Sequence, residues 1–524
     1  MRQGGAEPAG VDAAALLGRL AAVVPHTART VLQIGTGPGW LGRPLASRRP
    51  APQVALAPFA DQAVPDAAAV VSVLEETGEG LAVAAGSVDC IVYADSLGRL
   101  ADPVRALAAH RVLLAEGATA VASVPNLQHH GVLRDLLRGV FPYREGTLVE
   151  PADRRLFTAA DVVQLLLDAG YAPSVVDRVE DGDTGGIELA GGALFELLGV
   201  GATDAARDLR TSHLLVVGAP MAEVDPAGEE PISFVACVND EAQLAANLAR
   251  SPCFAPGTPH ELLVFRGAAS AGEGLNAGIA AARHDRVVLV HQDVYLPAGW
   301  PARLAAQWRA AAGGGGAIGI AGVFGVQDRR VPFDATGRVV HRDRLLDHRQ
   351  LPADVDGLDE LLMVVPRATE LRVDDALGWH LYGTDLALQA QQRGLRVVVL
   401  DAPCHHNSLT GRVPFAYRAS ERVLARKWPA QLPIHTNLSS IDTWLLDPAG
   451  EDGAAAPVGE APPEPGTGDG AEVVALVDRL RREQVVLHTE LEQARLQVAS
   501  MQASPFWRAR RLAVALLRRG GSGR

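Results

Sequence analysis

The segment "RVVLVHQDVYLPAGW" (286–300) begins with an apolar run and ends that run on His291, Gln292 and Asp293. A buried strand that finishes on an imidazole and a carboxylate has two interpretations. In the first, it is an ordinary strand exit in which Asp293 caps the following turn, as aspartate often does. In the second, the strand end holds a metal ion and a phosphorylated substrate, because carboxylate and imidazole groups both bind divalent cations.

A second chemically suggestive stretch is "VLQIGTGPGW" (31–40), which places Gly35, Gly37 and Gly39 directly after a predicted strand. Glycines at this place let the backbone turn sharply and come close to a nucleotide-like ligand at a helix N-terminus. The same glycines are also compatible with simple packing between a strand and a helix. The spacing alone therefore leaves a binding role and a packing role open.

The composition excludes several functional classes. The 524 residues carry a net charge of −13, which argues against a general nucleic-acid binder, because that function needs a basic face. The four cysteines are scattered without a CxxC pair, so neither a zinc site nor a disulfide framework is predicted. The chain has no run of eighteen apolar residues and no signal-like N-terminus. We therefore expect a cytoplasmic protein, or one bound peripherally at the inner face of the cell membrane.

Two long regions alternate Val- and Leu-rich runs with amphipathic stretches. This alternation predicts two doubly wound α/β domains, residues 1–220 and 231–445, each with a parallel sheet covered by helices on both faces. The predicted strands are "RTVLQIG", "QVALA", "VDCIVYA" and "GATAVASVP" in the first domain and "ISFVACV", "HELLVFR", "DRVVLVH" and "LRVVVLDAP" in the second. The predicted helices of the first domain are "PVRALAAHRVLL" and "AADVVQLLLDAG".

The C-terminal part has a different character. Residues 446–470 are rich in Pro, Gly and acidic residues and predict a disordered linker. Residues 471–503 carry an apolar seam with alternating spacings of four and three, which predicts a coiled-coil helix and a homodimer, or else a solitary surface helix. Residues 504–524 form a basic amphipathic tail suited to an anionic membrane surface or a partner protein.

The motifs that follow the glycine loop occur in a familiar order. They are "VDCIVYADSLGRLADP", "PN" and "RRLFTAADVVQLLLDAGY", where class I S-adenosylmethionine-dependent methyltransferases typically carry "DxLEHLxDP", "PN" and "RFFT…LLxxAGF". Residues 28–180 therefore resemble that family. The resemblance implies a Rossmann-like methyltransferase fold with a cofactor site at Gly35, Gly37, Gly39, Asp61 and Asp95.

The first domain also departs from the family where the chemistry matters. Gln33 stands where an acid is usual before the glycine loop, and Ala57 stands where an acid normally holds the ribose hydroxyls. Losing a carboxylate that accepts two hydroxyl donors weakens cofactor binding. A working methyltransferase and a degenerate scaffold are therefore both open.

The second domain also presents its motifs in order, from "PISFVACVNDE" through "EGLNAGIAAARHDRVVLVHQDV" and "GWHLYGTDLALQ" to "APCHHNS". This series resembles the GT-A glycosyltransferases of the family 2 type, over about residues 231–445. The resemblance implies a nucleotide-sugar donor and a divalent cation, Mg²⁺ or Mn²⁺. Asp293 is then the main ligand, His291 a weaker one, and His406 the preferred histidine of "CHHNS".

The same resemblance assigns the remaining roles. Asp385 is the expected general base, activating the acceptor hydroxyl. Each of these residues also has a purely structural interpretation. The histidines can be core or loop residues, Trp379 can serve only in packing, and Asn239 can stabilise a turn. The expected substrate-binding residues are Asn239, Asp240, Glu241, Asn276, Trp379 and His380.

These observations predict a glycosyltransferase that uses a glycan or lipid-linked acceptor in cell-surface polysaccharide or glycoconjugate biosynthesis. Its methyltransferase-like domain is either active or degenerate. Two alternatives stay open: an S-adenosylmethionine-dependent methyltransferase that acts on a sugar or glycan and carries a non-catalytic GT-A domain, and a scaffold without enzymatic activity.

Overall fold

The computed structural model describes residues 12–64, 69–70, 81–141, 143–180, 202–225, 228–408 and 416–446. We call residues 12–225 the first lobe and residues 228–446 the second lobe. The predicted coiled coil (471–503), the basic tail (504–524) and the linker beyond Leu446 lie outside the described residues. None of the helices in the described part is both long and apolar enough to cross a bilayer.

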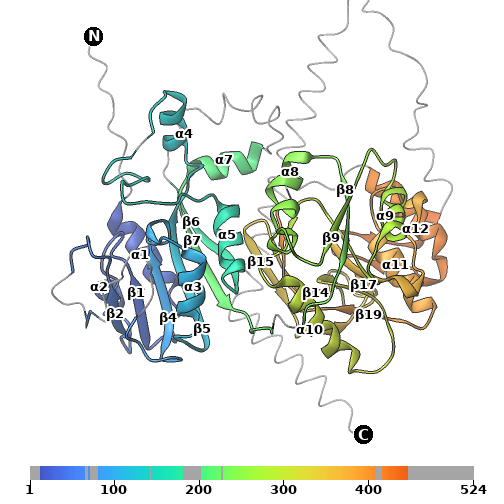
Figure 1. Ribbon diagram of the computed structural model, residues 1–524, viewed down its shortest axis with the longest axis horizontal. Helices are drawn as coiled ribbons and strands as arrows, with labels where there is room; N and C mark the ends of the chain where they lie inside the picture. The colour runs from blue at the N-terminus through green and yellow to red at the C-terminus, as the bar shows by residue number, and fades with distance from the viewer. Residues whose placement is uncertain are drawn as a thin grey trace, which may run out of the picture. The chain divides into compact units, whose positions relative to one another are not determined.

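The first lobe is built on a seven-stranded sheet with the order β3-β2-β1-β4-β5-β7-β6 (Figure 1). β7 is antiparallel to both of its neighbours, and the other pairs are parallel. The strands are β1 (Thr30–Ile34), β2 (Gln53–Ala57), β3 (Ala69–Val70), β4 (Val88–Ala94), β5 (Leu114–Pro125), β6 (Tyr171–Glu180) and β7 (Thr211–Pro220).

Helices cover both faces of this sheet because its strands are apolar on both sides. In β1, Leu32 and Ile34 join one core cluster, whereas Val31 joins the other. The lobe is therefore doubly wound and Rossmann-like, as the sequence predicted. Its helices are α1 (Ala13–Val23), α2 (Gly42–Leu45), α3 (Pro103–Arg111), α4 (His130–Leu137), α5 (Ala159–Asp168) and α7 (Ala202–Arg210), with the short turn η1 (Leu97–Arg99).

The second lobe contains a seven-stranded sheet with the order β16-β19-β12-β18-β10-β8-β9. β18 runs antiparallel between β10 and β12, and β16 is antiparallel to β19. The remaining pairs are parallel. The strands are β8 (Ser233–Val238), β9 (Glu261–Arg266), β10 (Arg286–Val290), β12 (Ile318–Gly322), β16 (Ala353–Asp354), β18 (Leu362–Pro366) and β19 (Arg396–Val399).

A six-stranded sheet beside it carries part of the site. The pairing of β11 with β20 and of β20 with β14 brings together segments that are far apart in sequence. Its strands are β11 (Val294–Tyr295), β13 (Phe324–Val326), β14 (Ala335–His341), β15 (Arg344–His348), β17 (Gly357–Leu358) and β20 (His405–His406). A two-stranded sheet of β21 (Ile434–His435) and β22 (Ser440–Ile441) ends the lobe.

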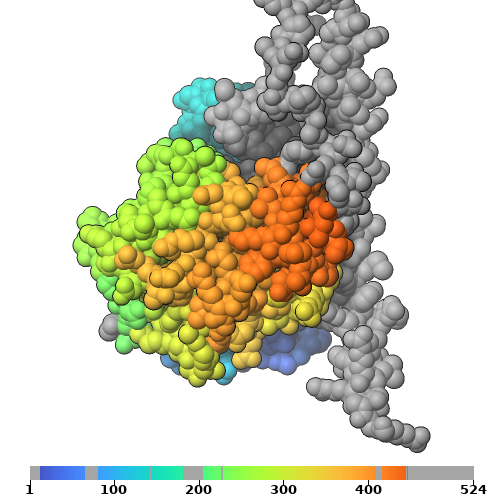
Figure 2. Space-filling view, turned by 90° about the vertical axis from the view of Figure 1, so that its right-hand side faces the viewer, coloured from blue at the N-terminus to red at the C-terminus, as the bar shows by residue number. Residues whose placement is uncertain are grey.

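The helices of the second lobe pack on both faces of its larger sheet, and alternate residues of β10 belong to different core clusters. In Figure 2 the last segments of this lobe, coloured orange to red, form one continuous surface. The helices are α8 (Glu241–Ala246), α9 (Ala271–Ala281), α10 (Trp300–Ala312), α11 (Tyr382–Gln392) and α12 (Ala416–Lys427). The short turns are η3 (Leu248–Arg250), η4 (Pro252–Phe254), η5 (Arg367–Thr369), η6 (Asp375–Leu377), η7 (Pro429–Gln431) and η8 (Thr443–Leu446).

The expectation of purely parallel sheets was wrong, because each large sheet is mixed. An apolar run buried on both faces has the same composition in either direction, so the sequence pattern does not reveal the reversal of β7 or β18. The second lobe is an α/β lobe as expected, and its identity as a GT-A domain stays a prediction.

Candidate functional site

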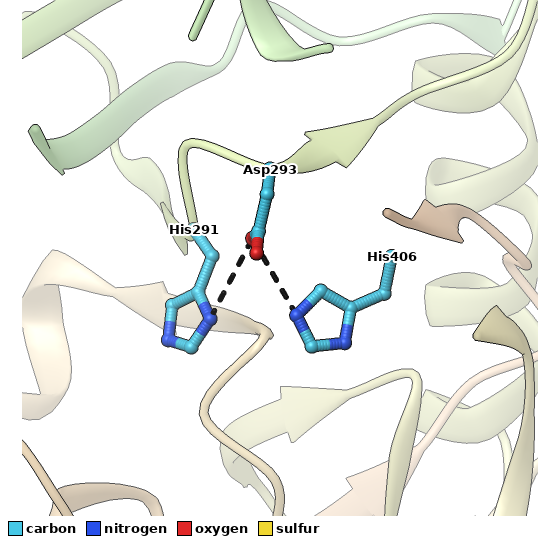
Figure 3. A group of neighbouring side chains, drawn as sticks. All are labelled: His291, Asp293 and His406. Carbon is cyan, nitrogen blue, oxygen red and sulfur yellow. Dashed lines mark ion pairs between the residues drawn. The ribbon is translucent and has the colours of Figure 1, made fainter. Parts of the chain in front are cut away.

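Three predicted cation ligands converge in the second lobe (Figure 3). His291 directly follows β10, Asp293 directly precedes β11, and His406 lies in β20. Because β11 pairs with β20 with Val294 opposite His406, residues more than a hundred positions apart meet at one sheet edge. One ligand atom from each side chain can be chosen so that all three lie within 4.8 Å of one another.

Asp293 is the centre of this group. Its Oδ1 atom lies 3.4 Å from His406 Nε2 and 4.0 Å from His291 Nδ1. The same oxygen is buried and has no hydrogen-bond partner. Burial by itself raises the pKa of Asp293, but the two imidazoles outweigh it and bring the pKa to about 2. Asp293 is therefore a carboxylate at neutral pH, and its Oδ1 atom faces both imidazoles.

The surroundings shift the pKa values of the two histidines in opposite directions. Burial lowers the pKa of His291. For His406 the attraction of Asp293 exceeds the effect of burial, so the pKa of His406 is raised. His291 also lies 3.1 Å from the Tyr382 hydroxyl through Nε2, which leaves Nδ1 on the side of Asp293.

One more imidazole, which was not among the residues predicted from the sequence, lies beside the cluster. His341, the last residue of β14, lies opposite His406 in the strand pairing, and the two Nδ1 atoms are 3.3 Å apart. Burial, followed by the neighbouring His406, lowers the pKa of His341 to about 4. The sequence did carry a signal, because "VVH" (339–341) ends an apolar strand on histidine just as "VLVH" (288–291) does.

The residues present fit a divalent cation. A divalent cation needs several donor atoms within a few ångströms of a common point. The two imidazoles and the carboxylate supply such atoms. The buried Asp293 oxygen makes no hydrogen bond of normal geometry and faces both imidazoles, which is compatible with a cation between them.

The predicted nucleotide turn, Asn239 to Glu241, is joined to the cation segment by Gln292. The Gln292 Oε1 atom accepts hydrogen bonds of 3.0 Å from the backbone N–H groups of Asn239 and Asp240, and its Nε2 donates to Asn239 Oδ1 at 2.6 Å. Asp240 caps α8 through Ala242 N and Glu241 pairs with Arg266. Two segments predicted separately are therefore adjacent.

Asn276 serves a local structural purpose. Its side chain exchanges two hydrogen bonds with the backbone of Val373, at 2.8 and 3.0 Å, and so ties α9 to the segment before η6. Both polar ends of the amide are used in this way. A role toward the diphosphate stays a prediction.

Asp385, the expected base, lies in the first turn of α11 and is fully buried. It accepts hydrogen bonds from Lys427 Nζ at 2.9 Å, Trp428 Nε1 at 2.7 Å and Gln389 Nε2 at 2.7 Å. These three hydrogen bonds tie the start of α11 to the end of α12 and use the carboxylate as a structural acceptor. The role of Asp385 as base therefore stays a prediction.

The two predicted acceptor-side residues before α11 differ in exposure. Trp379 is 44% exposed, so its indole is available as a flat apolar surface. The His380 ring packs on Tyr417, with ring centroids 5.3 Å apart, and burial lowers the pKa of His380. Their contact with an acceptor stays a prediction.

In the first lobe the glycine loop follows β1 as predicted. Gly35, Gly37 and Gly39 have φ values of 77°, 24° and 140°. A Cβ on Gly37 would lie 2.2 Å from the Ala94 carbonyl oxygen, so close approach to the end of β4 requires glycine there. The buried Gln33 amide stabilises the loop by bonding to Gly35, Gly39 and Leu41.

The loop borders a cavity of about 440 Å³, a size that suits a small-molecule ligand. Asp95, with φ of 47°, lines it directly after β4. The Asp95 carboxylate accepts a short hydrogen bond of 2.5 Å from Ser123 Oγ and lies 3.6 Å from His213 Nε2. A non-glycine residue held at positive φ beside a cavity is a common feature of functional sites.

The cavity fits S-adenosylmethionine only in part. The loop and the cavity size are suitable, but β2 ends on Ala57, which supplies no carboxylate for ribose hydroxyls. The next acid along the chain, Asp61, is paired with Arg99, and that guanidinium lies 5.0 Å from the centre of the Phe59 ring. Asp61 therefore already has a cationic partner at the place where a ribose anchor is expected.

Comparison with known proteins gives few matches in sequence. No protein-family model matches the chain. The curated "ATP synthase subunits region ORF 6" of Fuscovulum blasticum is 34% identical over 92 residues, which make up 17% of this chain and 37% of the relative. The chain spans little more than a third of the length of this relative, so the match assigns no family.

Solved structures match over about two fifths of the chain. An S-adenosylmethionine-dependent methyltransferase from Mesorhizobium loti is 17% identical and covers 38% of this chain and 95% of its own, with a TM-score of 0.25. One from Archaeoglobus fulgidus is 12% identical, with coverages of 39% and 93% and a TM-score of 0.28. The 1,6-didemethyltoxoflavin-N1-methyltransferase of Burkholderia thailandensis, which binds S-adenosylhomocysteine, is 15% identical, with coverages of 41% and 80% and a TM-score of 0.25. At such low identities and TM-scores these matches assign neither a family nor an activity to the chain.

Proposed function

We propose that the second lobe transfers a sugar from a nucleotide-sugar to a glycan or lipid-linked acceptor with the help of a divalent cation. The observation that carries this proposal is the convergence of His291 and His406 on one buried carboxylate oxygen of Asp293, at 4.0 and 3.4 Å. A cation bound there supplies Lewis-acid stabilisation for the charge that grows on a departing diphosphate.

The surrounding residues support the donor side of this proposal. Gln292 holds the Asn239–Asp240 turn next to the cation ligands, so a nucleotide on that turn would have its phosphates near Asp293. The Asp240 carboxylate is used to cap α8 and thereby fixes the shape of the turn. The motif order that resembles family 2 glycosyltransferases agrees with this arrangement.

Donor binding tests the proposal. We expect titration calorimetry with Mn²⁺ and a panel of nucleotide-sugars to give a binding signal with at least one donor, and slow donor hydrolysis to follow. Asp293→Asn removes the charged ligand and should abolish both. Asp177→Asn is the matched control. Asp177 lies in β6 of the first lobe, and within the described part of the chain its ion-pair partner is Arg19. Equal donor binding by the Asp293→Asn variant and the wild type would overturn the proposal.

A second candidate function is methyl transfer by the first lobe. The specific observation that favours it is the cavity of about 440 Å³ bordered by the glycine loop and Asp95 in a methyltransferase-like fold. We propose that S-adenosylmethionine binds there. Calorimetry with S-adenosylmethionine should show binding by the wild type and a loss in Asp95→Asn. Absence of heat from the wild type at high cofactor concentration would identify the first lobe as a scaffold.

A further inference from the structure

We infer that the first lobe contributes to the cation site, because its helix α5 positions β11, which directly follows Asp293, and β20, which contains His406. The inference rests on the cation site proposed above and assigns positioning roles to Gln164 and Asp168. Both residues belong to the first lobe by sequence, yet both are hydrogen-bonded to the second lobe.

Asp168 is the last residue of α5 and holds the strand that follows Asp293. One carboxylate oxygen accepts a hydrogen bond of 2.6 Å from the Tyr295 hydroxyl, and the other accepts one of 2.9 Å from the backbone N–H of Ala298. Tyr295 lies in β11, only two positions after the cation ligand. A carboxylate that accepts two donors from one segment restricts the movement of that segment.

Gln164, one turn earlier in α5, reaches the other ligand strand. It is buried, and its Nε2 lies 3.4 Å from His405 Nδ1. The opposite ring nitrogen of His405 lies 2.7 Å from the Arg342 carbonyl oxygen, which can only accept, so Nε2 carries the hydrogen and Nδ1 accepts from Gln164. His405 directly precedes the ligand His406 in β20.

A third connection leads back to Asp293. Gln164 Nε2 also lies 3.5 Å from Asn247 Oδ1, and the same oxygen accepts 3.1 Å from Asn407 Nδ2. The backbone N–H of Asn407 donates to the Asp293 carbonyl oxygen at 2.9 Å. The amide of Gln164 therefore reaches both ligand strands through hydrogen bonds.

The contact between the lobes at this place is also apolar. Val163 and Leu167 of α5 belong to one buried cluster with Val340 of β14, the strand that pairs with β20. Partners in the shell behind metal ligands fix ligand orientation, and their removal commonly lowers metal affinity. The helix is therefore placed to set the relative position of Asp293 and His406.

The experiment uses the full chain and measures Mn²⁺ affinity by calorimetry and by electron paramagnetic resonance. We expect Asp168→Asn, Tyr295→Phe and Gln164→Leu each to weaken Mn²⁺ binding about 10-fold. Because Asp168 and Tyr295 act on each other, the double variant should lose no more than the larger single loss. Asp177→Asn, in β6 of the same lobe, should bind Mn²⁺ like the wild type.

Thermal unfolding with and without Mn²⁺ distinguishes a positioning role of these residues from a purely structural one. A positioning role predicts that the Mn²⁺-induced rise in melting temperature becomes smaller in the variants, whatever happens to the metal-free value. Variants that bind Mn²⁺ within twofold of the wild type would overturn this inference and leave the cation site standing. A wild type that binds no Mn²⁺ would overturn both.

Discussion

The donor set of the cation cluster decides which ions should bind it. Two imidazoles and one carboxylate face one point, and imidazole nitrogen prefers first-row transition ions to Mg²⁺ or Ca²⁺. We therefore predict that Mn²⁺ and Co²⁺ bind at least about tenfold more tightly than Mg²⁺. Competition calorimetry measures this preference. His406→Gln should narrow the gap, since an amide oxygen favours neither class strongly. An equal affinity for Mg²⁺ and Mn²⁺ would contradict the assignment of both imidazoles as ligands.

A second residue-scale prediction concerns Glu360, which lies outside the cation group. Burial, and next the neighbouring Asp359, raise the pKa of Glu360 from 4.5 to about 8, although backbone N–H groups at the start of α11 oppose the shift. A carboxyl with a raised folded pKa holds its proton more firmly in the folded state, so stability is lost as the pH rises from about 4.5 to about 8. Glu360→Gln removes this titration.

The measurement is urea unfolding of both proteins across that pH range. The free energy of unfolding of the wild type should fall by ~1–3 kcal/mol more than that of Glu360→Gln. Glu116→Gln is the control, because Glu116 is exposed in β5. Parallel pH curves for the wild type and the Glu360 variant would contradict the raised pKa.

The site residues that were predicted from sequence are those at strand ends. His291, Asp293 and His406 meet because polar residues that follow buried strands gather at sheet edges, a rule the sequence allows one to apply. His341 was missed because its position depends on the register between β14 and β20. The hydrogen bonds that Asp385 accepts could not be predicted either. Two of their three donors come from the end of α12 and the residue after it, more than forty positions away in the sequence.

At the scale of elements, the start of α5 offers a direct test. Thr158 and Asp161 form a capping box in which the Thr158 hydroxyl accepts from Asp161 N and the Asp161 carboxylate accepts from Thr158 N. Thr158→Ala should lower the free energy of unfolding by about 1 kcal/mol, whereas Thr158→Ser should keep most of it. Chemical denaturation compares the three proteins. An Ala variant as stable as the Ser variant would show that the cap contributes nothing.

The elements themselves were largely predictable. β2 and β4 span the predicted "QVALA" and "VDCIVYA" without a change in bounds, because continuous apolar runs between helices indicate buried strands. The two-residue strands β11 and β20 were not predicted, since so short a strand has no periodicity to read. The pairing of these two strands nevertheless brings the cation ligands together, and this pairing does not depend on composition.

At the scale of the whole molecule, a buried ion network joins the lobes. Arg178 of β6 contacts Asp208 at 2.9 Å within the first lobe and Asp343, between β14 and β15 of the second lobe, at 2.5 Å. These side chains are only 11–16% exposed. Burial raises the pKa of Asp343, but Arg178 and Arg207 outweigh it and lower that pKa, so Asp343 is charged at neutral pH. Adjacent backbone groups complete the contact, with Val175 N donating to Asp343 O at 2.7 Å.

Arg178→Ala leaves Asp208 and Asp343 with Arg207 as their ion-pair partner among the described residues, at 3.5 and 3.7 Å, so the substitution should cost about 1–3 kcal/mol. Much of that loss falls on the contact between the lobes, so we predict that one calorimetric unfolding transition in the wild type separates into two in the variant. Arg19→Ala is the control, because the Arg19–Asp177 pair is 46% and 40% exposed and such pairs contribute little. If Arg178→Ala lowers the melting temperature but still unfolds in one transition, the apolar cluster around Val163 and Val340 is sufficient to couple the lobes. If the wild type itself unfolds in two transitions, the lobes are independent and the positioning role of α5 loses its physical basis.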